Sequence, residues 1–138
     1  MTEQERNAKI EYLKSYRWIE AEIRDDEERL AHMDARLYGP PCSTVSDMPR
    51  GGQAKGLDQL VAERLELKDR INEKCARKRE ILRAIESMPN ERDRRILKLE
   101  FIDDLTHEQT AERINYSVMQ TRRFYNTALE RFQILEHK

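Results

Sequence analysis

The sequence has few residues that break regular structure and few that react. Its 138 residues include four glycines, four prolines and two cysteines. Cys42 and Cys75 have neither C-x-x-C spacing nor a nearby pair of histidines, which excludes a zinc site and a disulfide framework. Because glycine and proline are sparse, we expect regular structure to fill most of the chain outside one loop.

Long apolar segments are also missing. No apolar run approaches the roughly 18 residues that a membrane span needs, and the first residues, MTEQERNAKI, lack the apolar core of a signal peptide. Two unpatterned cysteines are typical of reduced thiols in the cytoplasm. We therefore expect a soluble, cytoplasmic protein that does not engage a membrane.

Charge is abundant but balanced. The chain has 26 Lys and Arg against 27 Asp and Glu, and 38% of its residues are charged. That proportion exceeds the roughly 25% of ordinary domains and suits long, solvated helices. A local basic surplus lies near the end, where Arg122, Arg123 and Arg131 face only one acidic residue, Glu130, between residues 117 and 135. Overall charge therefore neither favours nor excludes nucleic acid, and its distribution must decide.

Two apolar stripes with helical spacing occupy the first 88 residues. The first predicts one helix over residues 3–38 and is interrupted by Asp26; the second predicts a helix over 57–88 and is interrupted by Arg64 and Lys78. Antiparallel packing as a helical hairpin buries both stripes, and self-association into a homodimer is the competing solution. The first stripe comprises Tyr12, Tyr16, Ile19, Ile23, Leu30, Met33 and Leu37, and the second comprises Leu57, Leu60, Val61, Leu67, Ile71, Cys75, Leu82 and Ile85.

The segment between the stripes, residues 39–56, reads GPPCSTVSDMPRGGQAKG and contains three of the four prolines and all four glycines. We interpret it as a loop, either a flexible linker or a segment that docks a partner. The pair Gly51-Gly52 follows Arg50, but the Gly-Lys-Ser/Thr pattern of a phosphate-binding loop is missing, which disfavours an anion site. The role of Ser46–Gly52 stays open.

The last third predicts three shorter helices. Pro89 ends the second long helix, and Asn90 is placed to cap a helix over 91–103 whose Ile96, Leu97, Phe101 and Ile102 point inward. Two capping boxes follow, Thr106 to Gln109 and Ser117 to Gln120. They predict a helix of about eight residues, a turn at Asn115-Tyr116 and a final helix over 118–135.

This order of helices is that of a helix-turn-helix DNA-binding module. Ala111 suits a close helix crossing, and Thr121, Phe124, Ala128 and Leu129 give the last helix an inward face. The opposite face carries side chains that pair with base edges and phosphates. We expect the following residues to bind DNA: Ser117, Met119, Gln120, Arg122, Arg123, Asn126 and Arg131. Which of the adjacent Arg122 and Arg123 reads bases is left open.

Residues 92–131, RDRRILKLEFIDDLTHEQTAERINYSVMQTRRFYNTALER, resemble region 4 of bacterial sigma factors. The wider architecture, two charged helices around a loop with SDMPRGG followed by this module, is similar to small phage-encoded regulators of the ArpU and RinA kind, which activate late transcription. The resemblance implies DNA binding in control of phage or prophage genes of the late or packaging type, in the cytoplasm of a bacterial host cell, with contacts to RNA polymerase. Thr121 stands where the sigma pattern has valine and Asn115 where it has glycine, so the DNA target does not follow by analogy.

We therefore expect an all-α protein, with an antiparallel hairpin over residues 1–88 and a helix-turn-helix module over 89–138. Its partners are double-stranded DNA, RNA polymerase and a second copy through the apolar stripes. An enzyme is disfavoured, since His32, His107 and His137 are scattered and no nucleophile, base and orienting group come together. No cofactor or metal is expected. The alternative function is a non-enzymatic adaptor that binds proteins through the hairpin.

Overall fold

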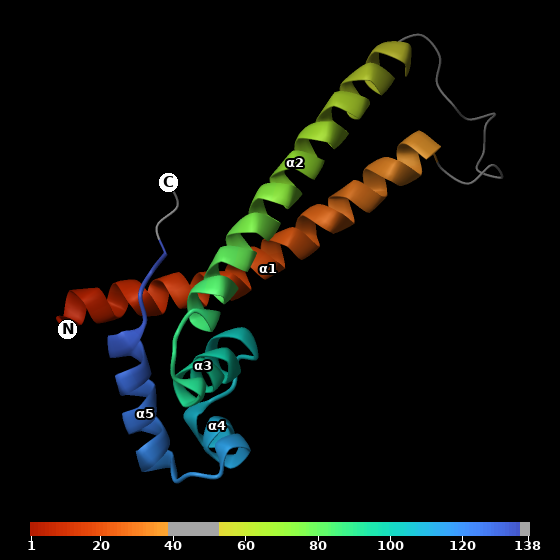
Figure 1. Ribbon diagram of the computed structural model, residues 1–138. Helices are drawn as coiled ribbons and strands as arrows, with labels where there is room; N and C mark the ends of the chain where they lie inside the picture. The colour runs from red at the N-terminus through yellow and green to blue at the C-terminus, as the bar shows by residue number, and fades with distance from the viewer. Residues whose placement is uncertain (39–52, 136–138) are drawn as a thin grey trace. The chain divides into compact units, whose positions relative to one another are not determined.

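The computed structural model describes residues 1–38 and 53–135, with side chains at 1–38 and 56–135 (Figure 1). Every regular element in these ranges is a helix, which confirms the all-α prediction. In chain order the elements are α1 (Glu3–Tyr38), α2 (Gln53–Glu86), α3 (Glu91–Leu97), the π-helix η2 (Lys98–Ile102), α4 (His107–Ile114) and α5 (Val118–Arg131).

Internal contacts divide the chain into two compact units. Unit 1 comprises Met1–Glu20 and Ala76–Lys138, and unit 2 comprises Ala21–Cys75. The sequence placed a boundary after residue 88, two residues beyond the end of α2 at Glu86, but the contacts group the first part of α1 and the last part of α2 with α3, α4 and α5. Burial accounts for this grouping, because Leu13 of α1 and Ile85 of α2 are fully inaccessible and belong to the apolar core of unit 1.

In unit 2, α1 and α2 run antiparallel. Asp26 binds Lys74, with 2.7 Å between Oδ2 and Nζ, whereas Asp34, later in α1, binds Arg64, earlier in α2. Asp26 and Arg64 are two of the residues that interrupt the apolar stripes in the sequence. Each of these two charged side chains therefore has an oppositely charged partner. The partner is most important for Asp26, which is 3% exposed, because burial of an unpaired charge is costly.

The apolar stripes are buried only in part. In unit 2, Ile23, Leu67 and Ile71 are buried, but Leu57 and Val61 of the second stripe are 48% and 41% exposed, so their predicted burial is wrong. Among the described residues of this unit, α1 and α2 are the elements present, so each helix has the other as its neighbour on one side. Positions at the edge of the shared face therefore stay in contact with water.

The start of α2 differs from the prediction. The helix begins at Gln53, so residues 53–56, assigned to the loop, are helical instead. Gln53, Ala54 and Lys55 are good helix formers, and a helix interior tolerates a single glycine at a modest cost. A Cβ at Gly56 would meet nothing within 4 Å, so no close packing requires glycine there. The remainder of the predicted loop, including Ser46–Gly52, lies outside the described residues.

The helix expected over 91–103 changes its winding midway. Asn90 caps α3 as predicted, since its side chain accepts hydrogen bonds from the backbone of Arg92 and Asp93. From Lys98 the chain continues as a π-helix, closed by a hydrogen bond from Asp103 N to Lys98 O at 3.0 Å. In this wider turn Leu99 and Phe101 are buried, whereas Ile102, predicted to point inward, is partly exposed.

The last helix is shorter than predicted. It ends at Arg131 rather than at residue 135, and Phe132 takes an extended conformation with φ −66° and ψ 137°. This turn of the backbone directs the Phe132 side chain into unit 1, where it is 0% exposed and lies 6.0 Å from the Tyr12 ring. Burial of this aromatic side chain outweighs continuation of the helix.

Candidate nucleic-acid interface

Two capping boxes set the start of α4 and α5, as the sequence predicted. The backbone N–H of Gln109 donates to Thr106 Oγ1 at 3.2 Å, and Thr106 N donates to Gln109 Oε1 at 2.9 Å. Ser117 and Gln120 repeat the arrangement, at 3.1 Å from Gln120 N to Ser117 Oγ. Each box satisfies backbone groups that a helix start leaves without intrahelical partners.

The turn between these helices depends on one left-handed residue. Asn115 has φ 61° and ψ 43°, and its N–H bonds to the carbonyl of Ala111. The next N–H, that of Tyr116, also reaches Ala111 O, at 3.2 Å. Asparagine adopts this conformation more readily than most residues other than glycine, which confirms the predicted turn.

We expect Asn115→Ala to lower the free energy of unfolding by about 1 kcal/mol, because alanine is strained in the left-handed region. Asn115→Gly, the matched variant without a Cβ, should leave stability unchanged or slightly higher. Urea denaturation followed by circular dichroism measures both. Equal stability of the two variants would contradict a left-handed Asn115.

The crossing of α4 and α5 is closely packed. Ala111, Thr121, Ala128 and Leu129 are all at most 4% exposed. The buried hydroxyl of Thr121 donates to Ser117 O at 2.8 Å, so threonine fits where the sigma pattern has valine. Phe124, predicted to point inward, is only partly buried.

All seven residues predicted to bind DNA are exposed. They differ in whether their side chains already interact with other residues of the protein. Met119 is 68% exposed, and the Arg123 side chain makes no hydrogen bond or ion pair with any residue in the described ranges, although its backbone carbonyl accepts from Thr127 Oγ1 at 3.0 Å. Arg122 is exposed and interacts electrostatically with Glu108 of α4. Ser117 and Gln120 form the capping box already described.

The remaining two candidates are bound within unit 1. Arg6 of α1 donates from Nη2 to Asn126 Oδ1 at 2.9 Å, and Arg131 Nη1 lies 3.1 Å from Oδ2 of Asp93. Asp93 is 0% exposed, so Arg131 compensates a buried charge. All seven candidates are thus exposed along α5, but Asn126 and Arg131 already have partners, and the contact of Arg131 with Asp93 is structural.

The sequence did not indicate that α1 lies against α5. Besides the bond from Arg6, Lys9 Nζ donates to the carbonyls of Leu129 and Glu130, at 2.9 and 3.2 Å. A lysine at the C-terminal end of a helix also complements the helix dipole. Trp18 of α1 is 73% exposed, although Tyr16 and Ile19 beside it are buried.

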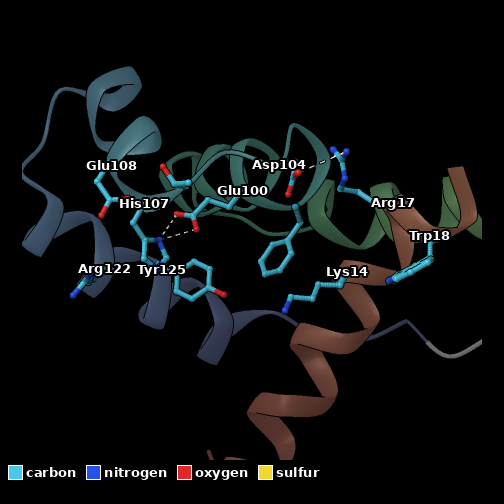
Figure 2. Close-up of a pocket in the computed structure, with 11 residues that line it drawn as sticks. Lys14, Arg17, Trp18, Glu100, Asp104, His107, Glu108, Arg122 and Tyr125 are labelled. Carbon is cyan, nitrogen blue, oxygen red and sulfur yellow. Dashed lines mark hydrogen bonds and ion pairs between the residues drawn. The ribbon is translucent and has the colours of Figure 1, made fainter. Parts of the chain in front are cut away.

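A hollow of about 640 Å³ lies beside α5 within unit 1 (Figure 2). In the close-up, Lys14 and Trp18 project from α1 on one side, and His107 and Arg122 lie on the other. Its lining residues are Lys14, Arg17, Trp18, Glu100, Phe101, Asp104, Thr106, His107, Glu108, Arg122 and Tyr125.

A comparison with known protein families matches residues 40–133 to the family described as "Protein of unknown function (DUF1492)". The chain belongs to this family. The DUF1492 match includes α2, α3, η2, α4 and α5, whereas α1 precedes it. Comparisons with curated proteins and with solved structures gave no match.

The acidic residues around the hollow are held by neighbours. The ring Nδ1 of His107 lies 2.7 Å from Oε1 of Glu100, and Arg17 Nη2 lies 3.7 Å from Oδ2 of Asp104. Burial raises the pKa of Glu100, and the His107 hydrogen bond partly offsets that effect. The pKa of Glu108 is lowered, first by its hydrogen bond to its own backbone N–H and also by Arg122.

Tyr125 was not predicted as an inward residue, yet it links the elements beneath the hollow. Its ring is 9% exposed, 4.8 Å from the His107 ring and 5.9 Å from the Phe101 ring. Burial, followed by the nearby Glu100, raises the pKa of its hydroxyl. This packing joins η2, α4 and α5 and so fixes the orientation of the exposed face of α5.

A second hollow, of about 680 Å³, lies over α3 and the turn before α5. Arg92, Arg94, Arg95 and Lys98 contribute to its lining. The Arg92 guanidinium also lies 3.7 Å from the centre of the Phe124 ring, a cation–π contact that ties α3 to α5.

Neither a cluster of metal-ligating side chains nor a membrane-spanning helix is found among the described residues of this DUF1492 member. Within residues 1–38 and 56–135, no three His, Cys, Asp or Glu side chains gather as they would around a metal ion. Over the same part of the chain, no helix combines the length and apolar character that crossing a membrane requires.

Proposed function

We propose that this protein binds double-stranded DNA through α4 and α5 and regulates transcription. The observation that carries the proposal is the exposed face at the start of α5, where Arg122 and Arg123 follow a capped helix, a left-handed turn and a second cap. A recognition helix contacts base edges with the residues nearest its N-terminus, and both arginines lie in the first two turns.

The chemistry of that face suits the major groove. An arginine can pair with O6 and N7 of guanine or with a phosphate, and the exposed Met119 offers an apolar contact to a thymine methyl group. The Gln120 amide accepts within the capping box through Oε1, which leaves its NH₂ group available as a donor. Asn126 and Arg131 lie further along α5 and have partners of their own, so they contribute less to base reading.

The resemblance to phage late-transcription regulators supplies the biological setting of the proposal. In that setting the DNA is a control region of late or packaging-type phage or prophage genes, and RNA polymerase is a further partner. The fold class agrees with this setting but does not distinguish it from other uses of a helix-turn-helix.

The test uses duplexes selected from a random pool by the full-length protein, with affinity measured by fluorescence anisotropy across a salt series. We expect Arg122→Ala and Arg123→Ala each to weaken binding. The arginine that reads a base should lose about 1 to 3 kcal/mol of discrimination at one base pair. The one that contacts a phosphate should instead reduce the dependence of affinity on salt.

Arg70→Ala is the matched control, since it removes an exposed arginine of unit 2. Affinity should be unchanged in this variant. If Arg122→Ala and Arg123→Ala also bind every selected duplex like the unchanged protein, α5 is not a recognition helix.

One observation favours an adaptor as the second candidate function. Leu57, Val61 and Leu65 follow one another at intervals of four residues on α2 and are between 41% and 57% exposed. Such spacing places them on one side of the helix, where they suit contact with another protein. An adaptor without a DNA-binding role would select no sequence from the pool.

A further inference from the structure

α1 is fastened along the C-terminal half of α5 within unit 1. Arg6 binds the Asn126 side chain, and Lys9 binds the last carbonyls of α5. The Tyr12 and Phe132 rings, whose centres are 6.0 Å apart, continue this contact beyond the end of the helix. α1 therefore leaves the first turns of α5 uncovered and borders them on one side.

Three exposed residues of α1, namely Lys14, Arg17 and Trp18, line the hollow beside α5. Arg17 is paired with Asp104, which leaves Lys14 and Trp18 for contact with a ligand. They are one helical turn apart and so lie on the same side of α1. Both line the hollow that also includes Arg122, as Figure 2 shows. The exposed side chain of Lys14 makes no ion pair or hydrogen bond with a residue of the described ranges, and Trp18 is 73% exposed.

The hollow offers an anionic occupant one lysine side chain that is not already paired within the described part of the chain. Glu100 is bound by His107 and Asp104 by Arg17, while Glu108 faces Arg122. Each acidic group thus has a positively charged or hydrogen-bonding neighbour, and among the cations that line the hollow it is Lys14 whose side chain has no partner within residues 1–38 and 56–135. The N-terminus of α4, at Thr106 and His107, adds the positive end of a helix dipole.

We propose that Lys14 and Trp18 contact the phosphate backbone of the DNA that α5 reads. The first 20 residues, which precede the family match, then form part of the DNA-binding surface. This inference rests on the proposed function, because its occupant is the duplex held by α5. Lys14 supplies a charge to one phosphate, and the indole N–H of Trp18 donates to a neighbouring one while its ring covers the sugar.

DNA is favoured over an acidic protein because the hollow is continuous with the exposed face of α5 through Arg122. A duplex whose major groove holds α5 has a phosphate backbone on either side of that helix. A separate protein partner would have to share Arg122 with the DNA. If the same duplex contacts both α5 and the hollow, no competition for Arg122 arises.

Trp18 is the only tryptophan of the chain, so its fluorescence reports on this surface directly. The probe is a duplex selected by the full-length protein. On saturation with this duplex, we expect a loss of access of Trp18 to acrylamide and a shift in its emission. If anisotropy shows binding while Trp18 keeps its emission and its access to acrylamide, the inference is wrong although the proposed function stands.

Charge removal provides the second measurement. We expect Lys14→Gln to weaken binding about five- to tenfold near 0.1 M salt and to lower the salt slope by about 0.9, the value for one phosphate contact. Lys68→Gln, an exposed lysine of unit 2, is the matched control and should change neither quantity.

The outcomes separate the two proposals. An unchanged salt slope in Lys14→Gln, with Arg123→Ala still impaired, overturns the role of α1 alone. Failure of the unchanged protein to bind any selected duplex overturns the proposed function together with this inference. An acidic peptide that protects Trp18 where the duplex does not would identify a protein as the occupant and reject DNA.

Discussion

Phe132→Ala is expected to lower the free energy of unfolding by about 3 to 5 kcal/mol, the usual range for emptying a buried aromatic site. Phe132 is 0% exposed and lies beyond the end of α5, where its ring meets Tyr12 of α1. Its loss removes apolar contacts of the core of unit 1 and weakens the attachment of α1 to α5. Guanidinium denaturation of the purified variant measures the change.

Ile134→Ala is the matched control, two residues further along. Ile134 is 37% exposed, so shortening it should cost about 0.5 kcal/mol or less, as surface substitutions usually do. A small effect of Phe132→Ala, comparable with that of Ile134→Ala, would mean that the chain after α5 is not packed as described.

Arg131→Ala is expected to destabilise the protein by about 2 to 3 kcal/mol, because it leaves the carboxylate of Asp93 buried without its cation. This value lies below the roughly 3 to 5 kcal/mol of fully buried pairs, since Arg131 itself is 53% exposed. Oδ1 of Asp93 has no hydrogen-bond partner among the described residues, so Arg131 is important for compensating this charge. Thermal unfolding and denaturant titration report the loss.

Two variants test whether the uncompensated charge of Asp93 causes this loss of stability. Asp93→Asn combined with Arg131→Ala removes the buried charge as well, so the double variant should be more stable than Arg131→Ala alone. Arg123→Ala, on the exposed face of the same helix, should change stability by no more than about 0.5 kcal/mol. If Arg131→Ala kept full stability and lost only DNA affinity, Arg131 would belong to the reading face after all.

The features that the sequence predicted correctly are those set by residues close together in the chain. The caps Asn90, Thr106 and Ser117 and the left-handed Asn115 involve residues at most four positions apart, so their residue types are sufficient to place them. Helical spacing likewise placed α1, for which the predicted and observed ranges agree.

Most of the errors arise where contacts between distant residues decide. Burial of Phe132 against the rest of unit 1 shortened α5. The π-helix is a local exception, since its winding between Lys98 and Asp103 changed which residues of 98–102 point inward. Arg131 has the residue type and position of a DNA contact, and its partner Asp93 lies 38 residues away in the sequence. The bond between Arg6 and Asn126 spans 120 residues, so no local pattern indicates that α1 borders α5.

The ion pairs of unit 2 also determine how α1 and α2 can align. A shift by one heptad would keep most apolar residues facing each other, but it would place Asp26 opposite Leu67 or Ile81, seven positions to either side of Lys74. A buried carboxylate against an aliphatic side chain is strongly unfavourable. Asp26 therefore disfavours an alignment of α1 and α2 that is shifted by one heptad. The apolar residues around it do not, because they would still face apolar residues after the shift.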